Sequence, residues 1–287
     1  MKTLVALLTL VAFGCGESVE TRMAKELARV EASLQASEQA KLPAEMQEMP
    51  KAYRAELEKA RSAKSPELRL YRLRNAAVGA ELLTFFHEHR NAAGKELAPL
   101  TKLWNERRAV FDRPVASVRG PLLQRALVES SRNRADKLFR ASLPYAKVSS
   151  PFAGVYYLAE AEGNRRFAEF VASLPGTKGG PSPRADRVEA ALRSLEGETL
   201  VAFGSDPTAP KMIPVSAKLK EAREQLAHGF VDGAALSLLE ARMRFSRGAD
   251  DQLPASLIAL ASERQPLQAK KVLPASVTVT LVRWPYT

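Results

Sequence analysis

The chain has a single cysteine, Cys15, and three histidines among 287 residues. One cysteine excludes an intramolecular disulfide framework. The sequence also lacks a glycine-rich phosphate-binding loop, a Gly-x-Ser-x-Gly elbow and a Ser-x-x-Lys box with its partners, which are the signatures of nucleotide-binding proteins and serine hydrolases. We therefore expect a protein that is not an enzyme, with no catalytic residue, no metal ligand and no cofactor.

Two of the histidines, His87 and His89, lie in the segment FFHEHR. On a helix, residues two apart project about 200° from each other, so one helix cannot direct both rings at one metal, unlike the i, i+4 spacing of helical zinc motifs. A metal-dependent envelope hydrolase that uses His87 and Glu88 is therefore the least favoured function. The third histidine, His228, is expected near a helix C-terminus, where the helix dipole favours it.

The N-terminal segment TLVALLTLVAFGCGES, residues 3–18, follows Lys2 and is apolar from Leu4 to Phe13 apart from Thr9. A basic start, about ten apolar residues and small residues at a cut site are typical of a secretory signal peptide. The run is too short to span a bilayer stably. We expect residues 1–14 to be removed on export.

Ala12-Phe13-Gly14-Cys15 resembles the lipobox of bacterial lipoproteins, although leucine is usual in place of Ala12 and a small residue in place of Phe13. The resemblance implies that Cys15 carries the lipid (palmitate among its acyl chains), and several chains anchor a protein firmly to a bilayer. Gly16 after the cysteine implies the outer membrane, facing the periplasm, rather than the inner membrane. An ordinary secretory cut is the alternative, which leaves Cys15 a free thiol on a secreted or periplasmic protein.

Basic residues outnumber acidic residues by 43 to 32, for a net charge of +11. This excess attracts anionic partners such as lipid headgroups or cell-wall polymers, whereas export makes nucleic acid an unexpected partner. The densest basic run, SSRNRADKLFR at 130–140, carries Arg132, Arg134, Lys137 and Arg140. It is either a docking face for an anionic polymer or a solvated helix face, and we favour the second.

The fold class is expected to be mainly α, a multi-helix bundle or an array of helical hairpins, with one or two short β-strands near the C-terminus. Ser65-Pro66 predicts a helix start, with serine as N-cap and proline at the first position. The helix that follows is the best candidate for the centre of the core, with apolar residues at Leu70, Leu73, Ala77, Ala80, Leu83, Phe85 and Phe86. Strands are expected at 198–203 and 276–284, which are rich in apolar and β-branched residues.

The segment PGTKGGPSP, residues 175–183, is the strongest break in the chain and predicts a linker. It separates a helical domain at 65–174 from a C-terminal helical-hairpin subdomain with a terminal strand at 184–287. Residues 15–64 form the lipid anchor and N-terminal helices, either as a flexible stalk or packed against the rest.

Residues 222–241, AREQLAHGFVDGAALSLLEA, resemble the turn and inner faces of a tetratricopeptide-type hairpin. The residues that carry the resemblance are Ala222, Gly229, Asp232, Ala234, Leu238 and Ala241. The chain departs from the family at Gln225, where an aromatic residue is expected, and at Ser246, where a proline is expected. The resemblance implies binding of a protein or peptide in a groove, and an ordinary antiparallel helix pair explains the same residues.

Two functions are favoured over the metal-dependent hydrolase. The preferred one is a non-catalytic envelope lipoprotein that binds or scaffolds another envelope protein through helical hairpins. The alternative is a basic module that binds an anionic glycan or lipid headgroup, and its binding would weaken steeply with salt.

The Cys15→Ala variant tests the anchor. We expect the unmodified chain to incorporate labelled palmitate and to sediment with membranes, and the variant to do neither, because the thiol is the site of acylation. Ser18→Ala is the matched control and should keep the label. Palmitate label on the Cys15→Ala variant, or no label on the wild-type chain, would contradict the assignment of Cys15 as the acylated residue.

Overall fold

The computed structural model describes residues 17–113, 118–176, 179–204, 212–246, 248 and 250–262. Within these ranges the chain forms ten α-helices, three short 3-10 helices and no β-strand. The α-helices are α1 Val19–Gln39, α2 Met49–Arg61, α3 Pro66–Glu88, α4 Leu97–Phe111, α5 Leu122–Val148, α6 Pro151–Ser173, α7 Ala185–Phe203, α8 Met212–Ala227, α9 Val231–Ser246 and α10 Leu253–Ala261. None of the described helices is both long and apolar enough to cross a membrane. Cys15 and the predicted signal peptide lie outside the described residues.

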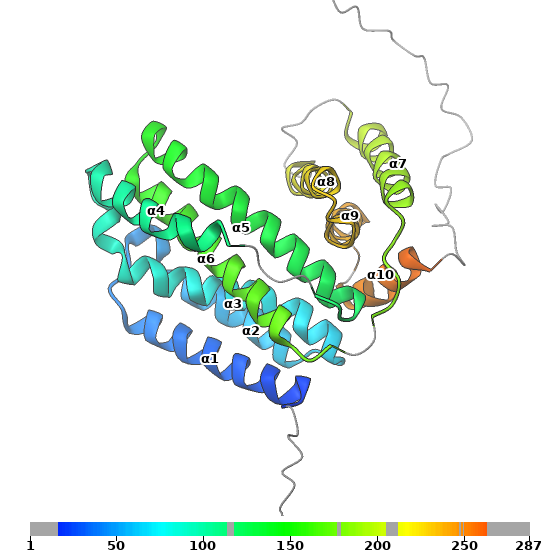
Figure 1. Cartoon of the computed structure of the whole chain (residues 1–287), viewed down its shortest axis with the longest axis horizontal. Helices are drawn as coiled ribbons and strands as arrows, with labels where there is room; N and C mark the ends of the chain where they lie inside the picture. The colour runs from blue at the N-terminus through cyan, green and yellow to red at the C-terminus, as the bar shows by residue number, and fades with distance from the viewer. Residues whose placement is uncertain are drawn as a thin grey trace, which may run out of the picture.

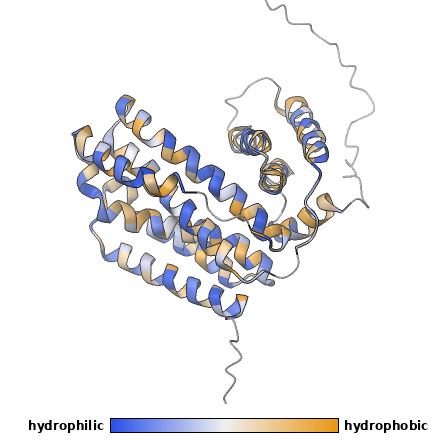
Figure 2. Ribbon diagram, viewed as in Figure 1, coloured by the Kyte–Doolittle hydropathy of each residue, from blue (hydrophilic) through white to orange (hydrophobic). Residues whose placement is uncertain are grey.

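The long helices α5 and α6 pair as a hairpin, and α3 packs along α6 with α1 and α2 against it (Figure 1). The hairpin of α8 and α9 stands on the other side of α5, which it contacts mainly through α9. Helix α7 flanks that hairpin. Apolar and polar residues are interleaved along the helices, as amphipathic packing requires (Figure 2).

Serine side chains cap the starts of three helices, α1, α3 and α6. The Ser65 hydroxyl accepts a hydrogen bond from the Leu68 backbone N–H at 3.1 Å, and Ser150 caps α6 through the Ala153 N–H at 3.2 Å. Proline follows Ser65 and Ser150 at the first helical position, where no intrahelical N–H is needed. The helix start predicted at Ser65-Pro66 is therefore confirmed.

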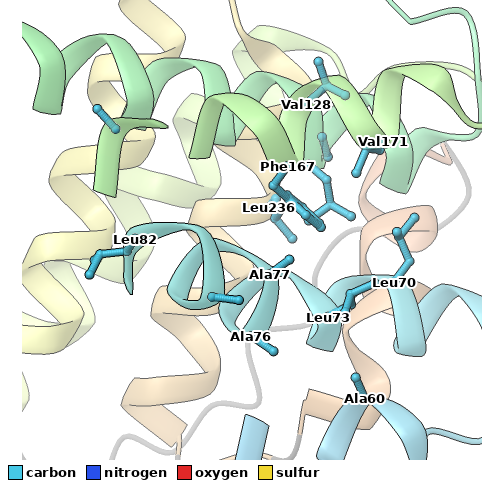
Figure 3. Close-up of a cluster of buried hydrophobic side chains, with 14 of the residues drawn as sticks. Ala60, Leu70, Leu73, Ala76, Ala77, Leu82, Val128, Phe167, Val171 and Leu236 are labelled. Atoms are coloured by element: carbon cyan, nitrogen blue, oxygen red, sulfur yellow. The ribbon is translucent and has the colours of Figure 1, made fainter. Parts of the chain in front are cut away.

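Helix α3 lies at the centre of the core, as predicted. All seven apolar residues that identified it are buried, and Leu73 and Ala80 are fully inaccessible. Figure 3 draws Ala77 of this helix together with Phe167 of α6 and Leu236 of α9 in one cluster of buried apolar side chains. The buried apolar side chains form one cluster that runs from Met23 to Leu260. Residues on both sides of 175–183 thus share a core, and the division into domains stays a prediction.

The N-terminal helices pack against α3 rather than standing apart from it. Met23, Val30 and Leu34 of α1 are buried, and Leu57 and Ala60 of α2 join them in the core. Of the two alternatives for residues 15–64, the described part therefore corresponds to packed helices.

The prediction of a strand at 198–203 is wrong. These residues form the last turns of α7, which ends at Phe203. Thr199 is buried, whereas Leu200 and Val201 are 57% and 66% exposed, so the apolar run lies largely on the surface of a helix. A run of six apolar and β-branched residues does not separate a strand from the end of a helix. The described chain is mainly α without the expected strand, and the second expected strand, 276–284, lies outside the described residues.

Glycines bring helices into close contact at two interfaces. A Cβ at Gly163 of α6 would lie 2.5 Å from the carbonyl oxygen of Val78 in α3. A Cβ at Gly233 of α9 would lie 3.0 Å from the backbone nitrogen of Ser130 in α5. Both contacts involve backbone atoms, which cannot move away as a flexible side chain would.

The Gly163→Ala variant tests the first contact. We expect the free energy of unfolding, measured by urea denaturation, to fall by about 1–3 kcal/mol, because the added methyl forces two helices apart. Gly197→Ala is the control, since nothing lies within 4 Å of a Cβ at that helical site. The control should gain about 0.5–1 kcal/mol from helix propensity. If Gly163→Ala and Gly197→Ala changed the free energy of unfolding equally, the close approach of α6 to α3 at Gly163 would be contradicted.

Candidate functional site

A cleft of about 740 Å³ lies where α2, α3, α5, α6 and α8 converge, and it is called the central cleft below. This volume is typical of ligand-binding pockets. The charged side chains that line it are the basic Arg74, Arg134, Lys137, Lys218, Lys220 and Arg244 and the acidic Glu56, Glu160 and Glu221. The lining itself has six basic groups and three acidic groups, and two carboxylates outside it, Glu240 and Glu224, pair with three of these cations.

A buried carboxylate lies beside the central cleft and binds two of its cations. Glu240 of α9 is 2% exposed, and its Oε2 lies 2.7 Å from Lys218 Nζ of α8. Arg74 of α3 pairs with the other carboxylate oxygen, which also accepts a hydrogen bond from the Tyr71 hydroxyl at 3.2 Å. One side chain of α9 therefore joins α3 to α8.

The charge state of this cluster follows from its contacts. Burial alone would raise the pKa of Glu240, but the charges of Arg74 and Lys218 outweigh it and hold the pKa well below its usual value. Burial also raises the pKa of the Tyr71 hydroxyl, which therefore stays protonated and donates its hydrogen bond. The carboxylate is ionised and the tyrosine neutral at physiological pH.

Two further cations of the lining are held by carboxylates. Arg134 Nε lies 3.0 Å from Glu160 Oε1 of α6, and Lys137 Nζ lies 2.7 Å from a carboxylate oxygen of Glu224 in α8. Both cations belong to the basic run at 130–140, which therefore contributes one wall of the central cleft. These pairs fix the positions of the charged groups along α5.

Two cations at the edge of the central cleft have no such partner. Lys220 of α8 and Arg244 of α9 are exposed. Within the described part of the chain, neither has a carboxylate within ion-pair distance, and Arg244 only donates a hydrogen bond to the Pro214 carbonyl oxygen at 3.2 Å. These two side chains are the ones free to bind an anion that enters.

Neutral polar groups complete the lining of the central cleft. Tyr53, Tyr71 and Tyr156 contribute rings and hydroxyls, and Asn75 and Asn164 contribute amides. The Ser131 hydroxyl is 1% exposed at the residue level and finds no hydrogen-bond partner among the described residues. Buried hydroxyls are normally hydrogen-bonded, so Ser131 is a polar group that a ligand could satisfy.

The histidines singled out in the sequence do not come together. His87 is exposed at the end of α3, and the His89 ring packs on Phe85 with 4.3 Å between the centroids. His228 Nδ1 lies 2.9 Å from the amide oxygen of Asn133. In the described ranges, no group of three His, Cys, Asp or Glu side chains is placed to hold a metal ion.

The helix pair predicted at 215–246 is present as α8 and α9. Gly229 has a φ of +75° in the turn, a conformation that glycine adopts without strain. Ala222, Ala234 and Ala241 are fully inaccessible in the hairpin. Membership of the tetratricopeptide family stays a prediction, because an ordinary antiparallel pair has the same features.

The sequence interpretation missed Arg74, Lys218 and Glu240. Glu240 follows the apolar stretch AALSLL, and a lone charge on an otherwise apolar helix face is the signal that could have identified it. No such local signal identifies its partners, since Arg74 lies 166 residues away in the chain.

Comparisons with protein-family models, curated proteins and solved structures gave no match.

The Glu240→Gln variant tests the buried cluster. We expect a loss of about 3 kcal/mol in the free energy of unfolding at pH 7, because two buried cations lose their carboxylate. The pKa of Glu240 is lower in the folded state, so its contribution is present above the ordinary value of 4.5 and is lost as the pH falls below it. The stability gap between wild type and variant should therefore narrow in acid.

Chemical denaturation at a series of pH values measures this gap. Glu20→Gln is the control, because Glu20 is exposed and has no ion pair in the described structure. It should change stability by less than about 0.5 kcal/mol. If the difference in stability between wild type and Glu240→Gln did not change with pH, the ionised state assigned to Glu240 would be contradicted.

Proposed function

We propose that the protein is a non-catalytic lipoprotein of the bacterial outer membrane that binds an anionic glycan in the central cleft. Acylated Cys15 attaches it to the bilayer, facing the periplasm, and nucleic acid is not among its partners. The observation that carries the proposal is that two cations of the lining, Lys220 and Arg244, have no carboxylate partner within the described chain. Unpaired cations in a cleft attract and retain anions.

The uncharged polar and aromatic groups that line the central cleft favour a glycan over other anions as the ligand. Sugars present hydroxyls that bond to amides and to serine or tyrosine hydroxyls, and their apolar ring faces stack on aromatic rings. Tyr53, Tyr156 and Asn75 offer these groups, and Ser131 adds an unsatisfied hydroxyl. An acidic sugar uses both this neutral lining and the two free cations.

Scaffolding of an envelope protein through the hairpin is the second candidate. Leu200 and Val201 near the end of α7 and Ile213 at the start of α8 are 57%, 66% and 55% exposed, which favours an apolar contact there. The second helix of the hairpin is unsuited to this role, because residues 232–241 of α9 are all buried in the protein itself. The described hairpin presents a surface through α8 and the last turns of α9, and both contribute residues to the central cleft.

Calorimetric titration with tri-galacturonic acid, with maltotriose as the neutral control, tests the proposal. We expect the acidic sugar alone to bind, more weakly at about 300 mM than at about 50 mM NaCl because salt screens exposed charges. Lys220→Gln and Arg244→Gln should each weaken binding about tenfold, the effect of one lost charge-assisted hydrogen bond. Lys95→Gln, at an exposed lysine that does not line the central cleft, should have no effect.

Two results would overturn the proposal. Equal binding of the neutral sugar would show that charge does not select the ligand. Binding to phosphatidylglycerol vesicles without binding to the acidic sugar would identify the ligand as a lipid headgroup.

A further inference from the structure

A second cleft of about 280 Å³ lies where the C-terminal end of α4, helices α5 and α6 and the turn between α8 and α9 meet. Different residues of α5 line the two clefts. Arg134 and Lys137 line the central cleft, whereas Arg132 and Arg140 line the second one. Asn133 lies between them and lines both.

The second cleft is lined by four arginines and one carboxylate, Arg113, Arg132, Arg140, Arg165 and Asp136. Arg140 binds Asp136 through its Nε at 2.8 Å, and Arg165 binds Glu162 at 2.8 Å. Arg113 and Arg132 have no carboxylate within ion-pair distance in the described structure. The second cleft therefore has two guanidinium groups whose charge no side chain there neutralises.

Aromatic rings orient two of these guanidinium groups. The Arg132 guanidinium lies over the Phe230 ring, 5.5 Å from its centroid, and that of Arg165 lies over Phe111 at 5.9 Å. A ring beneath a guanidinium plane restricts its motion and leaves the N–H groups at its edge available. For Arg132, which has no carboxylate partner among the described residues, those N–H groups are available to a ligand.

The imidazole of His228 completes the lining of the second cleft. The amide oxygen of Asn133 accepts a hydrogen bond from His228 Nδ1 at 2.9 Å, and Nε2 takes no part in that contact. The His228 ring also meets the Phe230 ring edge to face, with 6.1 Å between the centroids. The imidazole is thereby held on the same side of the turn as the ring that supports Arg132.

We propose that the second cleft binds a phosphoryl group, held by Arg132 and Arg113. Guanidinium groups match the oxygens of a phosphate in paired, charge-assisted hydrogen bonds, and a dianion balances two unpaired cations. The volume suits a phosphate with a small substituent rather than a polymer segment. The proposal is independent of the function assigned to the central cleft, because none of the cations is shared between the two.

Equilibrium dialysis of the full chain against radiolabelled inorganic phosphate tests the second cleft. We expect saturable binding that Arg132→Gln weakens about tenfold, because one charge-assisted contact is lost. Arg113→Gln should weaken binding as well, and this variant is safe for folding because Arg113 is exposed and has no ion pair in the described structure. Arg119→Gln, at an exposed arginine outside both clefts, should bind like the wild type.

The central-cleft variant Lys220→Gln separates the two sites, because it should bind phosphate as the wild type does. No saturable binding, or equal binding by wild type, Arg132→Gln and Arg113→Gln, would overturn the proposal. Competition by vesicles identifies the source of the phosphoryl group. Displacement of the label by phosphatidylglycerol but not phosphatidylcholine vesicles assigns the second cleft to an anionic lipid headgroup, and no displacement assigns it to a soluble phosphate compound.

Discussion

The buried carboxylate of Glu240 is the constraint on which the central cleft depends. An ion removed from water must be neutralised where it lies, and the two cations that do so come from α3 and α8. The helical hairpin is thereby attached to the N-terminal helices through charge as well as through apolar packing. Because Arg74 and Lys218 are committed to Glu240, they shape the wall of the central cleft and leave ligand binding to the unpaired cations at its edge.

Helix α5 has a different role, because it lines both clefts, as α6 also does. Its close backbone contact with α9 at Gly233 places the hairpin against it, and residues of α5 from Ser130 to Arg140 line the two cavities. Arg125, Arg134 and Lys137 of α5 bind carboxylates of neighbouring helices, and Arg132 is held by an aromatic ring instead. The excess positive charge of the chain is therefore concentrated in two localised sites rather than spread uniformly over the surface.

The sequence predicted most of the fold where the signals were local. A serine cap followed by proline located α3, and apolar spacing identified α3 as the central helix. The strand at 198–203 was wrong because six residues of mixed propensity fit either structure, and only packing of α7 on α8 and α9 decides between them. The candidate site was predicted least well. The basic run at 130–140 was identified but interpreted as a solvated helix face, whereas Arg134 and Lys137 line the central cleft. The pairing that leaves Lys220 and Arg244 free joins residues far apart in the chain, which no local pattern encodes.

A crystal structure of the protein with an acidic trisaccharide tests the central claim most directly. We expect the sugar between α3 and α8, with a carboxylate within hydrogen-bonding distance of Lys220 or Arg244 and a hydroxyl near Ser131. The Glu240 carboxylate should remain bound to Arg74 and Lys218 in that complex. A sugar bound elsewhere on the protein, or bound in the central cleft without contact to either free cation, would contradict the assignment.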